Sequence, residues 1–138
     1  MRDRVVRVVL VVWAAVSVQL GIWATFAPRS FYDDYPGFGR EWVRVNGPYN
    51  EHFVRDFGAL NFALAVVTIA ALVTLSRPMV IAVAVAWLAW SVPHLVYHLR
   101  HLDVFSTGDK VVNVFLRGSL PVLAVVVLVL TLRRPART

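Results

Sequence analysis

Three of the chain's four histidines lie close together near the end of one apolar run, at His94, His98 and His101. Successive residues of an α-helix are rotated by about 100°, so this spacing places the three imidazoles on one face. A His-x3-His-x2-His arrangement can direct two or three imidazoles at a single metal ion. The spacing therefore predicts a metal-binding face on this helix.

A second polar group lies at the start of another helix, where Glu51, His52, Arg55 and Asp56 follow one another closely. Glu51 and Arg55 are four residues apart, as are His52 and Asp56, so each pair can interact on the helix surface. Neutral imidazoles and carboxylates together suit zinc, copper or iron. If the two helix ends meet, we expect a transition-metal site that could catalyse a lipid or redox reaction. Its predicted ligands are His52, Asp56, His94, His98, His101 and Glu51.

Other interpretations of the same residues stay open. The polar side chains could form a structural network that fixes helix register in a non-catalytic accessory subunit of a larger membrane complex. Its further members would be Arg55, Asn61, Asn113 and Arg117. Alternatively, His52 with His94 or His98 could ligate haem b, or a His/Asp pair could bind a quinone. Metal, substrate, oligomeric state (a homo-oligomer included) and partner are not determined by these patterns.

Four apolar runs must position these residues. Of the 138 residues, 59% are hydrophobic and 16% are charged, against roughly 25% charged in soluble domains. Each run reaches about the 20 residues that a helix needs to cross a bilayer core. We therefore predict an all-α, four-transmembrane-helix bundle in one integral membrane domain over 1–138, with spans near 5–27, 49–75, 79–102 and 111–132. Cysteine is absent, which excludes thiolate catalysis and cysteine-ligated metals.

The connection between the first two spans is rich in aromatic residues. Residues 28–48 contain Phe31, Tyr32, Tyr35, Phe38 and Trp42 among charges and glycines. Such a segment is typical of the headgroup level of a bilayer, where amphipathic rings anchor a protein. Two interpretations follow: an aromatic belt that only anchors the chain, or a lid over the polar site.

Small residues predict the faces on which two helices pack. In the first span, Ser17, Gly21 and Ala24 recur at a helical spacing, which favours close approach of another helix. In the second span, alanines at 59, 63 and 70 continue the stripe of His52 and Asp56. We therefore expect the His52–Asp56 face to pack against a neighbouring helix.

Charge predicts the orientation. Four spans place both termini and the 76–78 turn on one side, with seven arginines and one acidic residue. The other side has seven basic and seven acidic residues. The number of basic residues alone is the same on both sides. The arginines beside the termini lack compensating acids, however, so we expect cytoplasmic termini in a multi-pass protein of the cell membrane. The formal net charge of +6 does not indicate nucleic-acid binding, because the basic residues lie mainly at the ends of apolar runs.

Two segments carry a family resemblance. Asn50-Glu51-His52…Arg55-Asp56-Phe57-Gly58-Ala59-Leu60-Asn61 and Pro93-His94…His98…His101, with the four-span layout, resemble small bacterial membrane proteins of the DoxX-like type, in particular actinobacterial members of unassigned activity. The resemblance implies a four-helix fold and a membrane location.

Overall fold

The computed structural model describes residues 2–133 and is almost entirely helical. Four long helices, each long and apolar enough to cross a membrane, agree with the four predicted spans. They are α1 (Arg2–Phe26), α3 (Glu51–Thr74), α4 (Arg77–Arg100) and α5 (Thr107–Leu132). The connection after α1 forms α2 (Pro28–Asp34), the strands β1 (Pro36–Gly37) and β2 (Arg40–Glu41), and the 3₁₀ turn η1 (Arg44–Asn46).

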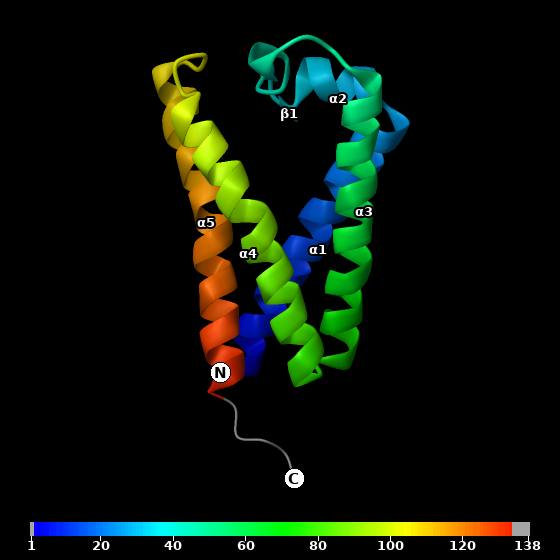
Figure 1. Ribbon diagram of the computed structural model, residues 1–138, viewed down its shortest axis with the longest axis vertical. Helices are drawn as coiled ribbons and strands as arrows, with labels where there is room; N and C mark the ends of the chain where they lie inside the picture. The colour runs from blue at the N-terminus through cyan, green and yellow to red at the C-terminus, as the bar shows by residue number, and fades with distance from the viewer. Residues whose placement is uncertain (1, 134–138) are drawn as a thin grey trace.

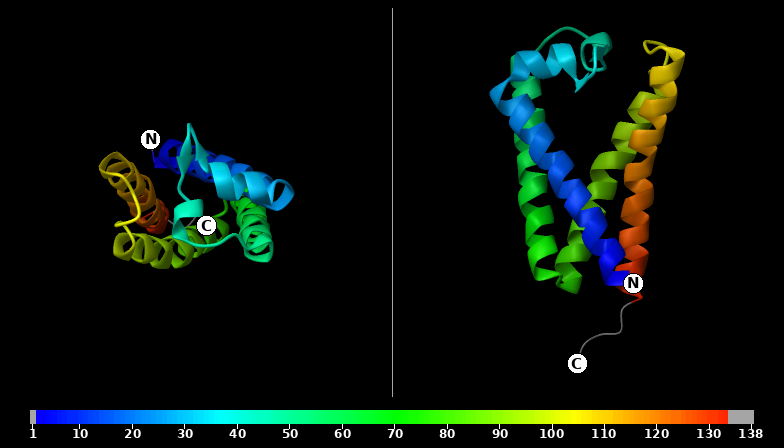
Figure 2. Two further views of the ribbon diagram at one scale, coloured as in Figure 1. Left: turned by 90° about the horizontal axis from the view of Figure 1, so that it is seen from above. Right: turned by 180° about the vertical axis from the view of Figure 1, so that it is seen from behind.

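The long helices form two pairs, α1 with α3 and α4 with α5. The pairs meet near the end that holds the N-terminus and the α3–α4 turn, here called the terminal end, and diverge toward the opposite end (Figures 1 and 2). Because α2 and the β1–β2 hairpin lie over that opposite end, it is called the lid end. At the terminal end, Arg2 and Arg77 donate to the carbonyl oxygens of Arg133 and Leu132, over 3.5 and 3.1 Å. Arg134 and Arg137, counted above on this side, lie outside the described residues.

The hydrophobic core occupies the terminal half, where the pairs meet. Side chains from all four long helices bury one another there, including Leu10, Ala71, Val83 and Val127. The centre of this core is a stack of two indoles, Trp13 of α1 and Trp87 of α4, with ring centroids 4.7 Å apart. The pairs therefore have one shared core at the terminal end and separate surfaces at the lid end.

The contact between α1 and α3 confirms one predicted packing face and corrects the other. Ser17, Gly21 and Ala24 are buried, as expected. The buried face of α3 contains Val54, Gly58, Asn61, Ala65, Thr68 and Ala71, whereas Ala59 and Ala63 are exposed. The face of α3 predicted to pack was therefore wrong: Ala59 and Ala63 are exposed and Ala70 is half-buried. The small residue that meets α1 is Gly58, so the stripe of His52 and Asp56 faces outward.

Candidate functional site

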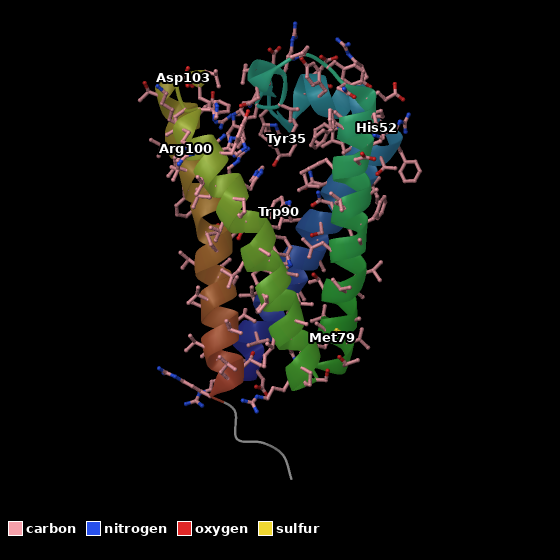
Figure 3. All side chains as sticks on the ribbon, in the orientation of Figure 1. Tyr35, His52, Met79, Trp90, Arg100 and Asp103 are labelled. Carbon is pink, nitrogen blue, oxygen red and sulfur yellow. The ribbon has the colours of Figure 1, made fainter. Side chains whose placement is uncertain are left out.

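The polar residues at the start of α3 lie on its outer surface. His52 Nε2 is 3.3 Å from Asp56 Oδ2, and their side chains are 80% and 56% exposed. Arg55 Nε donates to Glu51 Oε1 over 2.8 Å, and the same guanidinium donates to the carbonyl oxygen of Thr25. Figure 3 places His52 on α3, away from Tyr35, which lies between the two helix pairs.

The three histidines of α4 have different surroundings. His94 stacks on Trp90 at 4.9 Å, and its ring centroid is 4.6 Å from that of His98. His98 is only 7% exposed. His101, in contrast, is exposed and stacks on Tyr97 at 4.2 Å. Its Nδ1 lies 2.7 Å from the Tyr97 carbonyl oxygen, so Nδ1–H donates there.

The structure does not bring the predicted metal ligands together. Among residues 2–133, no group of three or more histidine, aspartate or glutamate side chains is placed to hold one metal ion. The physical reason is the divergence of the two helix pairs at the lid end, together with the outward direction of the His52–Asp56 stripe. Two imidazoles, those of His94 and His98, remain adjacent.

The predicted polar network is likewise divided among separate contacts. Asn61 Nδ2 donates to the Phe57 carbonyl oxygen within its own helix, over 2.8 Å, and Arg55 bonds Glu51 and the end of α1. Asn113 is fully buried, and neither polar atom of its side chain has a hydrogen-bond partner among the described residues. Only Arg117 of these four residues lines the cavity described next.

A cavity of about 620 Å³ lies at the lid end, and all four long helices contribute to its wall. The wall is mainly apolar and aromatic, with Leu20, Phe57, Trp90, Leu120 and Leu123 among its members. Polar side chains reach it mainly from α4, α5 and the connection after α1. They include His94, His98, Arg117, Ser119, Tyr35 and Asn46.

The 27–50 connection covers this cavity, which favours the lid interpretation of its aromatic residues. Phe31 and Trp42 line the cavity and are 4% and 3% exposed. The Tyr32 hydroxyl, also at the wall, donates to the Gly47 carbonyl oxygen over 2.6 Å and so ties the segment to itself. Phe38, at the tip of the β1–β2 hairpin, is fully exposed instead. We call residues 27–50 the lid.

One carboxylate joins the lid to the other helix pair. Asp109, in the first turn of α5, accepts a hydrogen bond from Trp42 Nε1 over 2.9 Å and is 3.0 Å from Arg40 Nη1. The Ser106 hydroxyl also donates to Asp109, over 2.7 Å. The lid is therefore continuous in sequence with α1 and α3 and is attached to α5 through Asp109. We call the contacts of Asp109 with Trp42 and Arg40 the latch.

The positive charge at the cavity belongs to Arg117. Its Cζ lies 5.2 Å from the ring centroid of Trp42, a distance that allows a cation–π interaction. Tyr35, His94 and His98 are within electrostatic range of the guanidinium. Burial raises the pKa of Tyr35, and the positive charge of Arg117 opposes part of that rise. The Tyr35 phenol is therefore protonated at neutral pH and can donate a hydrogen bond.

Three residues of this site, Tyr35, Trp42 and Asp109, were not predicted individually as site residues. The aromatic content of residues 28–48 was a signal for Tyr35 and Trp42. For Asp109, the Ser106-x-x-Asp109 spacing indicates a helix start, but nothing local indicates a contact with a residue 67 positions earlier. Long-range contacts of this kind depend on how the helices pack.

Comparison with protein-family models, curated proteins and solved structures finds no match. The resemblance to DoxX-like proteins therefore stays a prediction, and function has to be inferred from the residues of the cavity.

Proposed function

We propose that the protein is a multi-pass membrane protein that binds an amphiphilic organic molecule in the lid-end cavity. The observation that carries this proposal is the cavity itself, with a mostly apolar, aromatic wall and a few polar groups, among them His98 and Arg117. Small-molecule sites typically have volumes of about 300–1,000 Å³ and this kind of lining. A volume of about 620 Å³ suits a molecule with one long apolar chain or a few rings.

The cavity is partly open to its surroundings, so water, lipid or a ligand can enter and fill it. The apolar wall favours a hydrocarbon chain over water, because apolar surfaces offer water no hydrogen bonds.

The orientation that we propose puts the lid outside the cell. The terminal end carries Arg2, Arg4, Arg7 and Arg77 against Asp3, and an excess of arginine marks cytoplasmic loops. The cavity then lies in the outer half of the membrane, covered by the lid at the headgroup level. Amphiphiles dissolved in the outer leaflet would reach it without crossing the bilayer.

The test is to fill the cavity and measure which molecules stay bound during purification. Leu123→Trp adds volume at the cavity wall, whereas the adjacent Val122→Trp adds the same indole on a side chain that is 62% exposed. Mass spectrometry of organic extracts should detect an amphiphile in stoichiometric amount with the wild type and Val122→Trp, and a large loss with Leu123→Trp. Equal retention by both variants, or no retained molecule in the wild type, would count against the proposal.

A further inference from the structure

We infer that the bound amphiphile carries an oxyanion head group, a carboxylate or a phosphate monoester, and that Arg117 and His98 bind it. This inference rests on the proposed function and adds the chemical class of the ligand. It follows from a positive charge at the cavity wall that has no anionic partner among residues 2–133.

Arg117 is the residue placed to bind an anion. Its Nε is buried and has no hydrogen-bond partner in the described part of the chain, and none of the ion pairs found there includes Arg117. A guanidinium facing an apolar cavity loses hydration, and this is costly unless a counter-charge or hydrogen-bond acceptors replace the water. The Trp42 ring supplies a cation–π contact on one side, but a ring accepts no N–H···O bond.

None of the acids of the lid end forms an ion pair with Arg117 in the described part of the chain. Four have another cationic partner: Asp33 with Arg29, Glu41 with Arg44, Glu51 with Arg55 and Asp109 with Arg40. Asp56 lies beside His52 on the outer face of α3, and Asp34 and Asp103 are exposed and form no ion pair among residues 2–133. The counter-charge of Arg117 is therefore expected from outside the described chain, and the cavity gives an anion a route to it.

His98 supplies a second unsatisfied group at the same wall. Its side chain lines the cavity and is 7% exposed, and its Nδ1 has no hydrogen-bond partner among residues 2–133. Buried polar atoms in native proteins are nearly always hydrogen-bonded. An oxyanion between Arg117 and His98 would accept from both residues, with the Tyr35 hydroxyl available as a third donor.

The same chemistry favours an anionic head group over a neutral one. A guanidinium binds a carboxylate or phosphate through two parallel N–H···O bonds, and such charge-assisted bonds are stronger than bonds to a neutral oxygen. The carbonyl of a quinone or the hydroxyl of an alcohol could accept one bond but would leave the charge of Arg117 uncompensated. The apolar wall, including Phe57 and Leu120, would contact the chain of either ligand equally.

The first experiment compares head groups on one chain. The protein is reconstituted in phosphatidylcholine nanodiscs, and binding of radiolabelled stearate, octadecanol and octadecyl phosphate is measured. The amount bound by protein-free discs is subtracted in each case. We expect stearate or octadecyl phosphate to bind at least about tenfold more tightly than octadecanol, the difference that one charge-assisted hydrogen bond supplies. Whichever anion binds more tightly identifies the head group as carboxylate or phosphate.

The second experiment removes the charge. Arg117→Gln should lower the affinity for the anions to that for octadecanol while leaving octadecanol binding unchanged, and Arg117→Lys should retain part of the preference as a point charge. Two results would overturn the oxyanion assignment but leave amphiphile binding intact. The first is equal wild-type affinity for stearate, octadecyl phosphate and octadecanol. The second is tighter binding of a neutral quinone than of either anion. Failure of every probe to bind would instead refute the proposed function. The wild-type comparison needs no variant, so it decides the question even if Arg117→Gln does not fold.

Discussion

Replacement of Gly58 by alanine gives a direct test of the α1–α3 contact that supports the lid. A Cβ at this position would clash with Thr25 Oγ1 and would lie 2.7 Å from the Thr25 backbone nitrogen. A side-chain hydroxyl could rotate away, but the backbone nitrogen moves only if α1 and α3 separate. Overpacking of this kind costs about 1–3 kcal/mol. Alanine returns about 0.5–1 kcal/mol because it is the better helix former, so the net loss is about 0–2.5 kcal/mol, with a midpoint near 1 kcal/mol.

Two other glycines make the test quantitative. A Cβ at Gly21 would lie 3.1 to 3.2 Å from atoms of Phe62, a contact that a small shift can relieve, and a Cβ at Gly118 meets no atom within 4 Å. We expect the melting temperature in detergent to fall by about 3–5 °C for Gly58→Ala, to fall less for Gly21→Ala, and to stay equal or rise for Gly118→Ala. If the Gly58→Ala and Gly118→Ala proteins had the same melting temperature, the close approach of α1 and α3 would be refuted.

Three further predictions concern the latch, the orientation and the histidines. Asp109→Ala removes the acceptor of the Trp42 indole and the partner of an arginine, so a bound amphiphile should dissociate about tenfold faster in an off-rate assay; an unchanged rate would show that the latch does not control release. In this cysteine-free chain, a cysteine at Phe38 should react with an impermeant maleimide on intact cells and one at Ser76 only after permeabilisation, and the reverse result would invert the topology. Any stoichiometric metal found by elemental analysis should be lost in His98→Ala and retained in His52→Ala, because the His52 side chain is 80% exposed; loss with His52→Ala would contradict this geometry.

The helices were predictable because long apolar runs leave the backbone few alternatives in a bilayer. Every buried N–H and C=O must be satisfied within the segment, and a helix achieves this alone. The predicted spans therefore agree with α1, α3, α4 and α5 to within a few residues. The packing face of α1 was also predictable, since Gly21 and Ala24 allow a close approach that larger residues prevent.

The site was only partly predictable because hydropathy does not determine which face of a helix meets which neighbour. A rotation of about 100° separates Gly58, which packs on α1, from Ala59, which is exposed, and this single step turns His52 and Asp56 outward. The divergence of the two helix pairs is likewise a tertiary property. Sequence spacing correctly placed His94 and His98 side by side, and the aromatic residues of 28–48 allowed a lid as one of two interpretations. No local pattern indicated that Arg117 would face these histidines.

The way in which the lid is held indicates how a ligand would enter the cavity. The helix pairs are joined at the terminal end by the shared core around the Trp13–Trp87 stack, and separating them would expose many buried apolar side chains at about 25 cal/mol per Å². The latch is much weaker. It consists of one indole hydrogen bond and one ion pair between side chains that are 38% and 23% exposed, and partly exposed pairs are worth about 0–1 kcal/mol. Movement of the lid edge away from Asp109 would also expose the indole of Trp42, which is 3% exposed and lies 6.2 Å from the Phe105 ring. It is still less costly than separating the shared core, and it would uncover the residue in contact with Arg117. Release of the latch and exposure of the anion-binding group would then occur in the same movement.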